Sequence, residues 1–318
     1  MRVVVTGATG LIGRRVVAAL TERSDEVTVL SRNPERALHA FERAGAPAGP
    51  DAPAAGSPQA VAWNPTAEPA PAQALAGRDT IVHLAGEEIA QRWSASAKEK
   101  IRASRVQGTR NLVAGIAALP ESERPRTLVS GSAIGYYGPR GDEPLDEEAP
   151  PGPGFLAQTC VAWETEANAA TELGLRVVTV RTGVVLDRAG GALAKMLPPF
   201  KLGIGGPVAG GRQYVSWIEP TDLTGIVLAA LDDERFSGAV NATAPEPVRN
   251  AELTKALGRA LHRPALLPVP GMALKALYGE MSEVVTTGAR VVPAKALMNG
   301  YEFRYAQLDE ALQAALSR

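Results

Sequence analysis

The stretch RVVVTGATGLIG, residues 2–13, decides the fold class of this 318-residue chain. The β-branched run Val3–Val5 predicts a short buried strand, and glycines at every third residue follow it directly. Apolar residues then recur at helical spacing from Ile12 to Arg23. A strand that turns at glycines into a helix is typical of the opening unit of a nucleotide-binding α/β domain.

The three glycines of this stretch have separate physical roles. Gly7 permits the tight turn after the strand, Gly10 lets a diphosphate approach the backbone, and Gly13 lets the helix pack closely on the strand. The first turn of the helix then offers free N–H groups and a partial positive charge to phosphate. The sequence therefore predicts dinucleotide binding, and the alternative is a tight turn that binds nothing. The loop residues predicted to contact the cofactor are Gly7, Thr9, Gly10, Leu11, Ile12 and Gly13.

The end of the second predicted strand, Val27–Leu30, indicates which dinucleotide is bound. A site specific for NAD usually presents an acid to the ribose about 20 residues after the glycines. Here Ser31 and Arg32 follow the strand, and no acid stands at this point. A hydroxyl and a guanidinium suit the 2′-phosphate of NADP, because arginine forms forked hydrogen bonds with phosphate oxygens. We expect NADP(H); the alternative is a solvated Arg32 without a ligand.

Strands and helices continue to alternate along the chain. Further strands are predicted at Ala60–Trp63, Thr80–Leu84, Thr127–Ser130, Val177–Arg181 and Ala239–Thr243. Further helices are predicted at Ala95–Ala118, Leu156–Leu173, Trp217–Ala230, Asn250–Leu261, Met272–Glu280 and Leu308–Ala315. Continuous apolar strands suit a parallel sheet covered on both faces, and repeated β-α-β order implies right-handed crossovers. The predicted class is α/β, with a doubly wound parallel sheet.

Composition suggests how the chain divides into domains. Residues 44–60 hold 7 Ala, 3 Gly and 4 Pro, which predicts a flexible surface insertion, because such a segment buries little apolar surface. We assign residues 1–185 and 213–245 to the nucleotide-binding domain. Residues 186–212 and 246–318 are assigned to a small C-terminal substrate lobe.

The glycine-rich stretch Gly191–Arg212 predicts a hinged cover over the substrate. Its cations Lys195, Lys201 and Arg212 could hold an anionic group. The alternative is a solvated surface loop.

Charge and cysteine content argue against several classes of protein. Lys and Arg total 33 against 34 Asp and Glu, so a nucleic-acid or anionic-membrane surface is not expected. The single Cys160 permits no intrachain disulfide, and the three dispersed histidines give no metal-ligand spacing. No apolar run reaches the roughly 18 residues of a membrane span. We expect a cytoplasmic monomer or homodimer that takes a small-molecule substrate and no metal.

Motifs spread over nearly the whole chain carry a resemblance to a known family. They read TGATGLIG at Thr6–Gly13, SRNP at Ser31–Pro34, HLAGE at His83–Glu87, SR at Ser104–Arg105, SGSAIGYYG at Ser130–Gly138, RTGVVL at Arg181–Leu186, SWIEPTDL at Ser216–Leu223 and NATAPEPVRN at Asn241–Asn250. With the C-terminal region 263–305, they make the sequence resemble the atypical, epimerase-family branch of the extended short-chain dehydrogenase/reductases, which look like nucleotide-sugar epimerases.

This resemblance implies a Rossmann-like fold with a C-terminal substrate lobe. It implies that Leu84, Ala85 and Gly86 line the adenosine half of the cofactor. It also implies that Thr182, Gly183 and Val184 lie near the nicotinamide. Arg105 stands where the superfamily often has Asn, and it is predicted to bring a cation toward the cofactor.

The resemblance breaks down at the catalytic centre. Members of the superfamily usually carry Tyr-x-x-x-Lys on the helix after the fifth strand, where Leu156 and Cys160 stand here. Leucine cannot transfer a proton, and a neutral thiol supplies no fixed charge. The resemblance implies that Ser132 is the catalytic hydroxyl, with Tyr136 or Tyr137 of the following loop as the phenol. The alternative for either tyrosine is aromatic packing.

Two nearby residues on the same predicted helix are given structural roles. Cys160 is expected to be a buried, inert thiol, because no neighbouring base or cation is evident. Glu164, one turn later, is expected to be a surface or salt-bridging residue rather than a proton carrier.

Two functions of different kinds remain open. The favoured function is that of an NADP(H)-dependent oxidoreductase or epimerase-like enzyme acting on an unidentified small molecule. The rival is a non-catalytic NADP(H)-binding sensor or scaffold, which the missing Tyr and Lys support. An ordinary nucleotide-sugar epimerase is least favoured, because it would need both the missing Tyr and an NAD-type acid.

Overall fold

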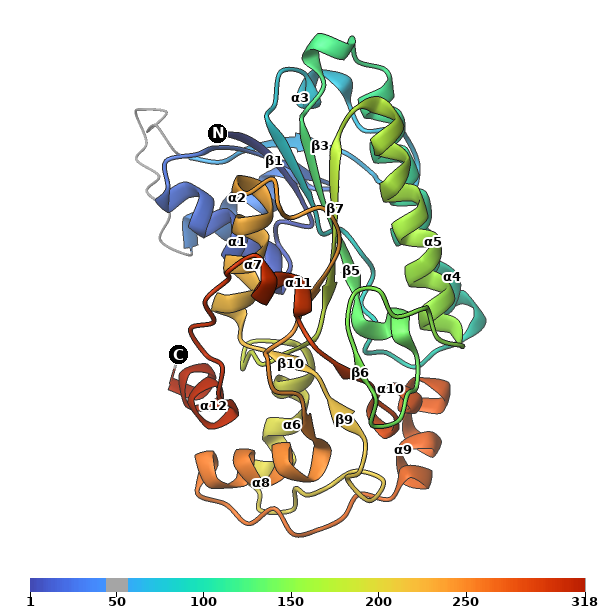
Figure 1. The fold of residues 1–318 in the computed structure, drawn as a ribbon, viewed down its shortest axis with the longest axis vertical. Coiled ribbons are helices and arrows are strands. Elements are labelled where there is room, and N and C mark those ends of the chain that lie inside the picture. The colour runs from blue at the N-terminus through green and yellow to red at the C-terminus, as the bar shows by residue number, and fades with distance from the viewer. Residues whose placement is uncertain (44–56, 318) are drawn as a thin grey trace.

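The computed structural model describes residues 1–43 and 57–317 of the chain (Figure 1). The predicted flexible insertion lies outside the described residues as far as residue 56, and its last two residues already belong to a strand. No described helix is both long enough and apolar enough to cross a membrane.

A seven-stranded parallel sheet forms the centre of the molecule, in the order β3-β2-β1-β4-β5-β7-β11. Its strands are β1 Arg2–Thr6, β2 Glu26–Ser31, β3 Gln59–Ala62, β4 Thr80–His83, β5 Thr127–Ala133, β7 Arg176–Thr182 and β11 Gly238–Ala242. The chain runs outward from β1 to β3, crosses to β4, and then runs the other way to β11. This order confirms the doubly wound α/β prediction, and β1 and β4 flank the point where the direction reverses.

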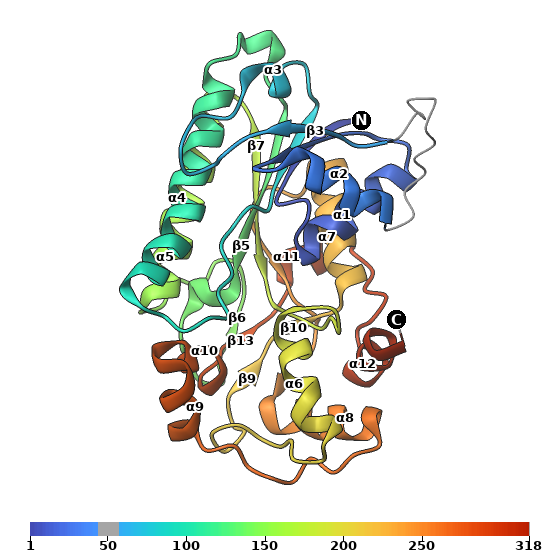
Figure 2. The ribbon, with the colours of Figure 1, turned by 180° about the vertical axis from the view of Figure 1, so that it is seen from behind.

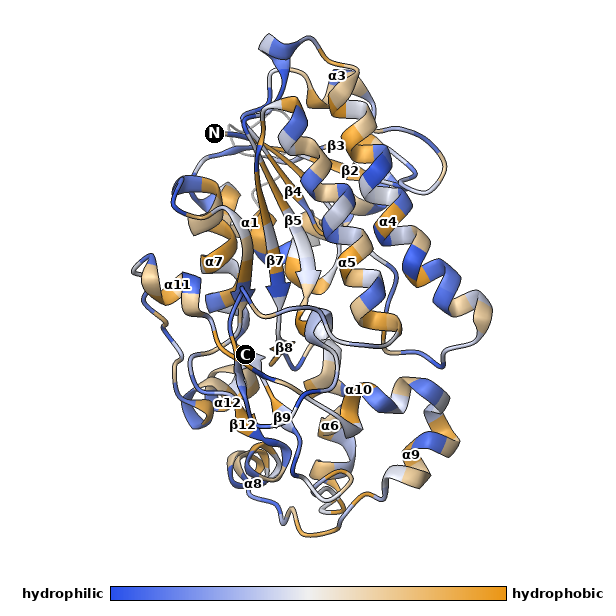
Figure 3. Ribbon diagram, turned by 45° about the vertical axis from the view of Figure 1, so that its right-hand side comes forward, coloured by the Kyte–Doolittle hydropathy of each residue, from blue (hydrophilic) through white to orange (hydrophobic). Residues whose placement is uncertain are grey.

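Helices cover both faces of the sheet, because successive residues of a strand point to opposite sides. On one face Val3 and Val5 pack with helices α1, α2 and α7, and on the other Val4 packs with α3, α4 and α5. These helices are α1 Leu11–Glu22, α2 Pro34–Arg43, α3 Ala72–Leu75, α4 Ala95–Ala117, α5 Phe155–Asn168 and α7 Pro220–Asp232. Figure 3 shows the apolar colour on strands in the middle of the sheet, between the two helical layers, and the hydrophilic colour at the end of β7.

A separate apolar cluster builds the lobe beyond the carboxyl ends of the strands. Helices α6 Gly191–Lys201, α8 Asn250–Leu261 and α12 Leu308–Ser317 pack together around the fully buried Trp217. Figure 2 shows these three helices below the sheet. The lobe therefore stands next to the edge at which α/β proteins bind ligands.

Two predicted segments differ in the structure. The predicted cover Gly191–Arg212 begins with a regular helix, because Leu193, Leu197 and Phe200 recur at helical spacing and all face the lobe's core. The helix predicted from Trp217 begins only at Pro220, since proline favours the first helical position. Trp217 itself lies in the short strand β10 Trp217–Ile218, which pairs with β8 Val184–Val185.

The C-terminal region does not lie wholly in the lobe. Helix α11 Ala294–Met298 packs against β11, and Ala296 is part of the core beside the sheet. The other short elements are β6 Pro144–Leu145, β9 Tyr214–Val215, β12 Val248–Arg249, β13 Arg290–Val291, α9 Gly271–Tyr278, α10 Glu283–Thr286 and the 3-10 helices η1 Glu121–Glu123, η2 Ile134–Tyr137, η3 Ala169–Leu173 and η4 Gly279–Ser282. Helix α11 thus belongs by its packing to the nucleotide-binding part, although its residues fall in the stretch that we assigned to the lobe.

Candidate nucleotide-binding and active site

The glycine turn after β1 is packed so tightly that side chains would not fit. Gly7 has a φ of +67°, and a Cβ there would lie 2.5 Å from the carbonyl carbon of Leu84. A Cβ on Gly13 would lie 2.2 Å from the carbonyl oxygen of Gly7. Helix α1 begins after Gly10 with no side-chain cap and no acid in its first turn. Its first N–H groups are therefore open to an anion at the reversal point of the sheet.

A buried histidine beneath this edge joins three elements. His83 of β4 is fully buried, with Nδ1 2.7 Å from Thr6 Oγ1 and Nε2 3.0 Å from Thr109 Oγ1 of α4. Thr6 Oγ1 also accepts the Ala85 N–H at 3.3 Å. Burial lowers the pKa of His83 to about 4. These hydrogen bonds hold the segment after β4 against the glycine turn, a role that the sequence did not predict.

An arginine without a partner among the described residues follows the end of β2. Ser31 Oγ donates to the Asn33 carbonyl at 3.1 Å, and Asn33 Oδ1 accepts the Arg36 N–H at the start of α2. Arg32 between them is exposed, and it makes no hydrogen bond or ion pair with any residue that the structure describes. The local geometry therefore holds the backbone of this loop and leaves the guanidinium free for a phosphate.

The predicted nicotinamide segment follows β7. A Cβ on Gly183 would lie 2.6 Å from the carbonyl oxygen of Ser216, and Val184 begins the pairing with β10. Thr182 Oγ1 donates to the Val180 carbonyl at 3.4 Å. The three residues thus lie where the sheet meets the lobe, and their contact with a nicotinamide stays a prediction.

The loop between β8 and α6 lies over the start of α1. Arg15 of α1 forms an ion pair with the buried Asp187 at 2.7 Å, and a Cβ on Gly190 would lie 3.1 Å from Leu11 Cδ1. Leu11 and Ile12 line a narrow gap with Val185 and Asp187. This loop therefore packs on the first turns of α1, and the sequence offered no signal for the ion pair.

Ser132 is bound to a buried ion pair. Its hydroxyl donates to Glu164 Oε1 at 2.6 Å, and Arg181 donates from Nε and Nη2 to the two Glu164 oxygens, both at 2.8 Å. All three side chains are buried. Glu164 is thus the salt-bridging residue that we expected. Because the Ser132 proton goes to the carboxylate, the serine oxygen can accept a hydrogen bond from a ligand.

The two positions of the usual Tyr-x-x-x-Lys pair are filled by apolar packing. Leu156 would contact a Cβ placed on Gly135, and Cys160 is 4% exposed. Burial raises the pKa of the Cys160 thiol to about 11, so it stays neutral. This agrees with the inert thiol that the sequence predicts.

The structure separates the two candidate tyrosines. Tyr137 is fully buried, its hydroxyl lies 2.7 Å from Asn241 Oδ1, and it accepts a hydrogen bond from Arg181 Nη1 at 3.0 Å. Burial raises its pKa to about 12. Tyr136 is partly exposed, its ring lies 3.5 Å from Arg181 Cζ, and its hydroxyl bonds to no described residue. The geometry favours a structural role for Tyr137 and leaves only the phenol of Tyr136 open to a ligand.

Arg105 of helix α4 lies beside the segment that follows β4. Its Nη1 donates to the carbonyl oxygens of Glu87 at 3.0 Å and Ile101 at 3.2 Å, and its guanidinium lies 5.2 Å from the ring of Trp163. Burial lowers the pKa of this guanidinium. Arg105 thus lies against the segment that follows β4, and its contact with a cofactor stays a prediction.

The cations of the predicted cover lie apart from the glycine turn. Lys195 of α6 bonds to Glu88 and to the Ala90 carbonyl, which ties the lobe to the segment after β4. Lys201 and Arg212 are exposed.

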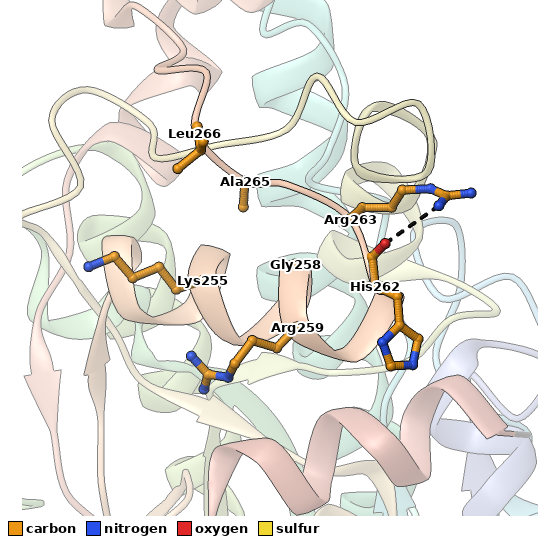
Figure 4. A pocket seen from close by; sticks show the side chains of 7 residues that line it. All are labelled: Lys255, Gly258, Arg259, His262, Arg263, Ala265 and Leu266. Carbon is orange, nitrogen blue, oxygen red and sulfur yellow. Dashed lines mark hydrogen bonds between the residues drawn. The ribbon is translucent and has the colours of Figure 1, made fainter.

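A second depression, of about 610 Å³, lies on the lobe itself (Figure 4). It is lined by Lys255, Gly258, Arg259, His262, Arg263, Ala265 and Leu266. Arg259 is paired with Asp309, and Arg263 bonds to the Lys201 and His262 carbonyls. Arg259 and Arg263 thus already have partners within the protein. The depression lies in the lobe rather than at the carboxyl ends of the sheet strands.

Comparisons with known proteins agree with the motifs. The model of the NAD dependent epimerase/dehydratase family matches residues 3–242, and the domain of unknown function DUF1731 matches residues 269–315. The chloroplastic SDR39U1 homolog of Arabidopsis thaliana, an epimerase family protein, is 40% identical over 99% of this chain and 87% of its own length. An epimerase family protein of Mycobacterium bovis is 39% identical over 99% of this chain and 98% of its own.

A solved structure gives the same result in three dimensions. The crystal structure of human epimerase family protein SDR39U1 (isoform 2) with NADPH is 33% identical, covers 100% of both chains, and has a TM-score of 0.85. The Rossmann-like fold and the epimerase-family resemblance are both confirmed. By sequence and by structure, the chain belongs to the NAD dependent epimerase/dehydratase family, and its C-terminal residues 269–315 match DUF1731.

Proposed function

We propose that this protein binds NADP(H) and acts as an oxidoreductase or epimerase-like enzyme on a small molecule. The observation that carries the proposal is the guanidinium of Arg32 at the end of β2, which bonds to no described residue, together with the uncapped start of α1. A dinucleotide whose diphosphate lies on α1 would bring its 2′-phosphate toward Arg32. The NADPH in the human SDR39U1 structure supports this choice of cofactor.

The chain's own residues fit the remaining tasks of such an enzyme. When bound, the nicotinamide supplies hydride exchange. The free hydroxyl of Tyr136 would donate a hydrogen bond to a substrate oxygen, and the Ser132 oxygen would accept one from a substrate hydroxyl. The buried Glu164–Arg181 pair holds both groups, because Ser132 bonds to the carboxylate and Tyr136 lies on the guanidinium.

The cofactor half of the proposal is tested with Arg32→Ala. Hydrogen bonds to charged groups contribute roughly 1.5–3 kcal/mol, so the Kd for NADPH should rise about tenfold or more. The Kd for NADH should stay unchanged, because NADH carries no 2′-phosphate. Calorimetric titration of parent and variant with both cofactors measures this. Equal NADPH affinities in parent and variant would refute the assignment.

A non-catalytic sensor or scaffold is the second candidate. Leu156 and Cys160 at the Tyr and Lys positions favour it, because neither side chain can move a proton at neutral pH. A panel of carbonyl compounds and sugars, followed by NADPH absorbance, separates the two functions. Tight NADPH binding with no turnover on any compound would favour the sensor.

A further inference from the structure

Helix α9 carries a single charged residue, Lys275, and buries none of its residues. Its large apolar side chains point to every side, and a helix with that pattern is normally covered by other parts of a protein. Figures 1 and 2 show α9 at the outside of the lobe, on the side away from α12. No described segment covers it there, so α9 has the character of a surface that associates with something else.

Helices α9 and α10 form a hairpin through the 3-10 helix η4. A Cβ on Gly271, at the start of α9, would lie 3.7 Å from Thr286 Cγ2, at the end of α10. We call residues 271–287 the C-terminal hairpin. It presents five exposed large apolar side chains, which are Met272, Leu277, Tyr278, Val284 and Val285.

The C-terminal hairpin has a fixed position on the molecule. Met281 and Ser282 are its only buried residues. The neighbouring Glu280 forms an ion pair with Lys98 of α4. The hairpin is therefore anchored through η4, and its apolar side chains lie on an exposed surface that is held in place.

Two charged side chains of the hairpin lack a partner within the described part of the chain. The Lys275 ammonium and the Glu283 carboxylate are both exposed, and neither makes an ion pair there, not even with the other. In a two-fold symmetric contact, each copy offers the same surface to the other. Lys275 of one copy can then meet Glu283 of the other, and the same pair forms twice. The hairpin is thus complementary in charge to a second hairpin.

The same two charges argue against other occupants of this surface. One lysine beside one unpaired glutamate gives no basic excess, whereas an anionic membrane or a nucleic acid attracts surfaces that have one. A second copy of this chain supplies both the apolar side chains and the opposite charges that the hairpin requires.

We propose that the C-terminal hairpin is a two-fold interface between two copies of this chain, with Lys275 of each copy paired to Glu283 of the other. The inference does not depend on the proposed function, because it uses no residue of the nucleotide-binding edge. Interfaces of standard size take about 20–30 residues from each side, and small ones are transient. The hairpin is shorter than that, so we expect a reversible dimer.

Sedimentation velocity on the full chain at roughly 1–200 μM tests the interface, because weak dimers dissociate within this range. Leu277→Asp, at a side chain that is 65% exposed, should raise the dissociation constant of the dimer about tenfold or more. Lys275→Glu and Glu283→Lys should each weaken the dimer, since each places like charges opposite one another. Lys100→Glu, at an exposed lysine of α4, is the matched control and should dimerise like the parent.

Mixing the two charge variants separates a specific pairing from a general attraction. An equimolar mixture of Lys275→Glu and Glu283→Lys restores opposite charges at both contacts, so a dimer should form that is tighter than either variant forms alone. A mixture no tighter than the separate variants would overturn the pairing.

The remaining outcomes also decide the proposal. A parent that stays monomeric up to about 200 μM refutes it, and so does a parent dimer that Leu277→Asp leaves intact, because its interface then lies elsewhere. A monomeric parent that floats with phosphatidylcholine vesicles would assign the hairpin to a lipid surface and refute the proposal as well.

Discussion

Glycine at position 13 is required by the backbone of Gly7 and Ala8, which leaves no room for a side chain. A Cβ there would overlap the Gly7 carbonyl oxygen at 2.2 Å, which neither the strand nor the helix can relieve by a side-chain movement. We expect Gly13→Ala to lower the unfolding free energy by about 1–3 kcal/mol, as overpacking does, and to abolish NADPH binding. Urea denaturation and calorimetry measure both effects. Gly141→Ala is the control, since a Cβ there meets nothing within 4 Å, and a similar loss in that variant would contradict the argument.

The neighbouring tyrosines should respond oppositely to loss of the hydroxyl. Tyr137→Phe removes a buried partner of Arg181 and Asn241, so we expect it to cost about 1–3 kcal/mol of stability. Tyr136→Phe should leave stability unchanged and lower turnover, because its hydroxyl bonds to no described residue. Chemical denaturation and an NADPH-linked assay separate the two. A destabilised Tyr136→Phe beside an unaffected Tyr137→Phe would reverse the roles.

Residues whose role is set by neighbours in sequence were predictable, and those set by distant partners were not. Gly10 and Gly13 face the Gly7 carbonyl within the same turn, and Gly7 itself has a positive φ, so their spacing was sufficient. The burial of Tyr137 depends on Asn241, which is 104 residues away, and no local pattern distinguishes it from Tyr136. The contacts of Ser132 were hidden for the same reason, since Glu164 and Arg181 come from other elements.

At the level of elements, His83 joins β4 to β1 and α4, and this link should depend on pH. Burial lowers its pKa to about 4, whereas an unfolded histidine titrates near 6.5. Between pH 6.5 and pH 4 this histidine is protonated in the unfolded chain but neutral in the folded chain, so the unfolding free energy falls as the pH falls. The loss should total about 3 kcal/mol by pH 4 and be absent above pH 6.5.

Unfolding free energy measured by urea between pH 4 and pH 8 tests this dependence. His83→Gln cannot titrate, so its stability should lack the part of the slope that belongs to the histidine. An identical slope in parent and variant between pH 6.5 and pH 4 would show that another group is responsible.

Long stretches without proline were found within a few residues, and the misjudged elements were those decided by tertiary contacts. Helix α4 was predicted at Ala95–Ala118 and spans Ala95–Ala117. Helix α6 was missed because Pro198 and Pro199 lie inside it, yet the burial of Leu193 and Leu197 in the lobe outweighs the prolines. Local propensity alone could not have shown this.

At the scale of the whole molecule, the alternation of strands and helices gave the doubly wound sheet, but not the path of the C-terminal region. That path depends on contacts between residues far apart in sequence. Helix α11 returns to β11, and Asp222 of α7 accepts hydrogen bonds from the backbone N–H groups of Arg304 at 2.8 Å and Tyr305 at 2.9 Å. The Tyr301 hydroxyl also donates to Asp222. It lies next to Gly225, where a Cβ would be 2.1 Å from the phenol oxygen.

These bonds predict that the sheet and the lobe unfold together. Asp222 is 1% exposed, so Asp222→Ala would leave two backbone N–H groups unpaired, at a cost of roughly 1–3 kcal/mol for each buried donor. We expect one transition in the parent, with tryptophan fluorescence and far-ultraviolet circular dichroism coincident in urea. In Asp222→Ala the link between α7 and the segment before α12 is lost, so the two signals should separate. Asp233→Ala, directly after the far end of α7, keeps that link and should keep the single transition. Separate transitions already in the parent would show that Asp222 does not couple the two parts.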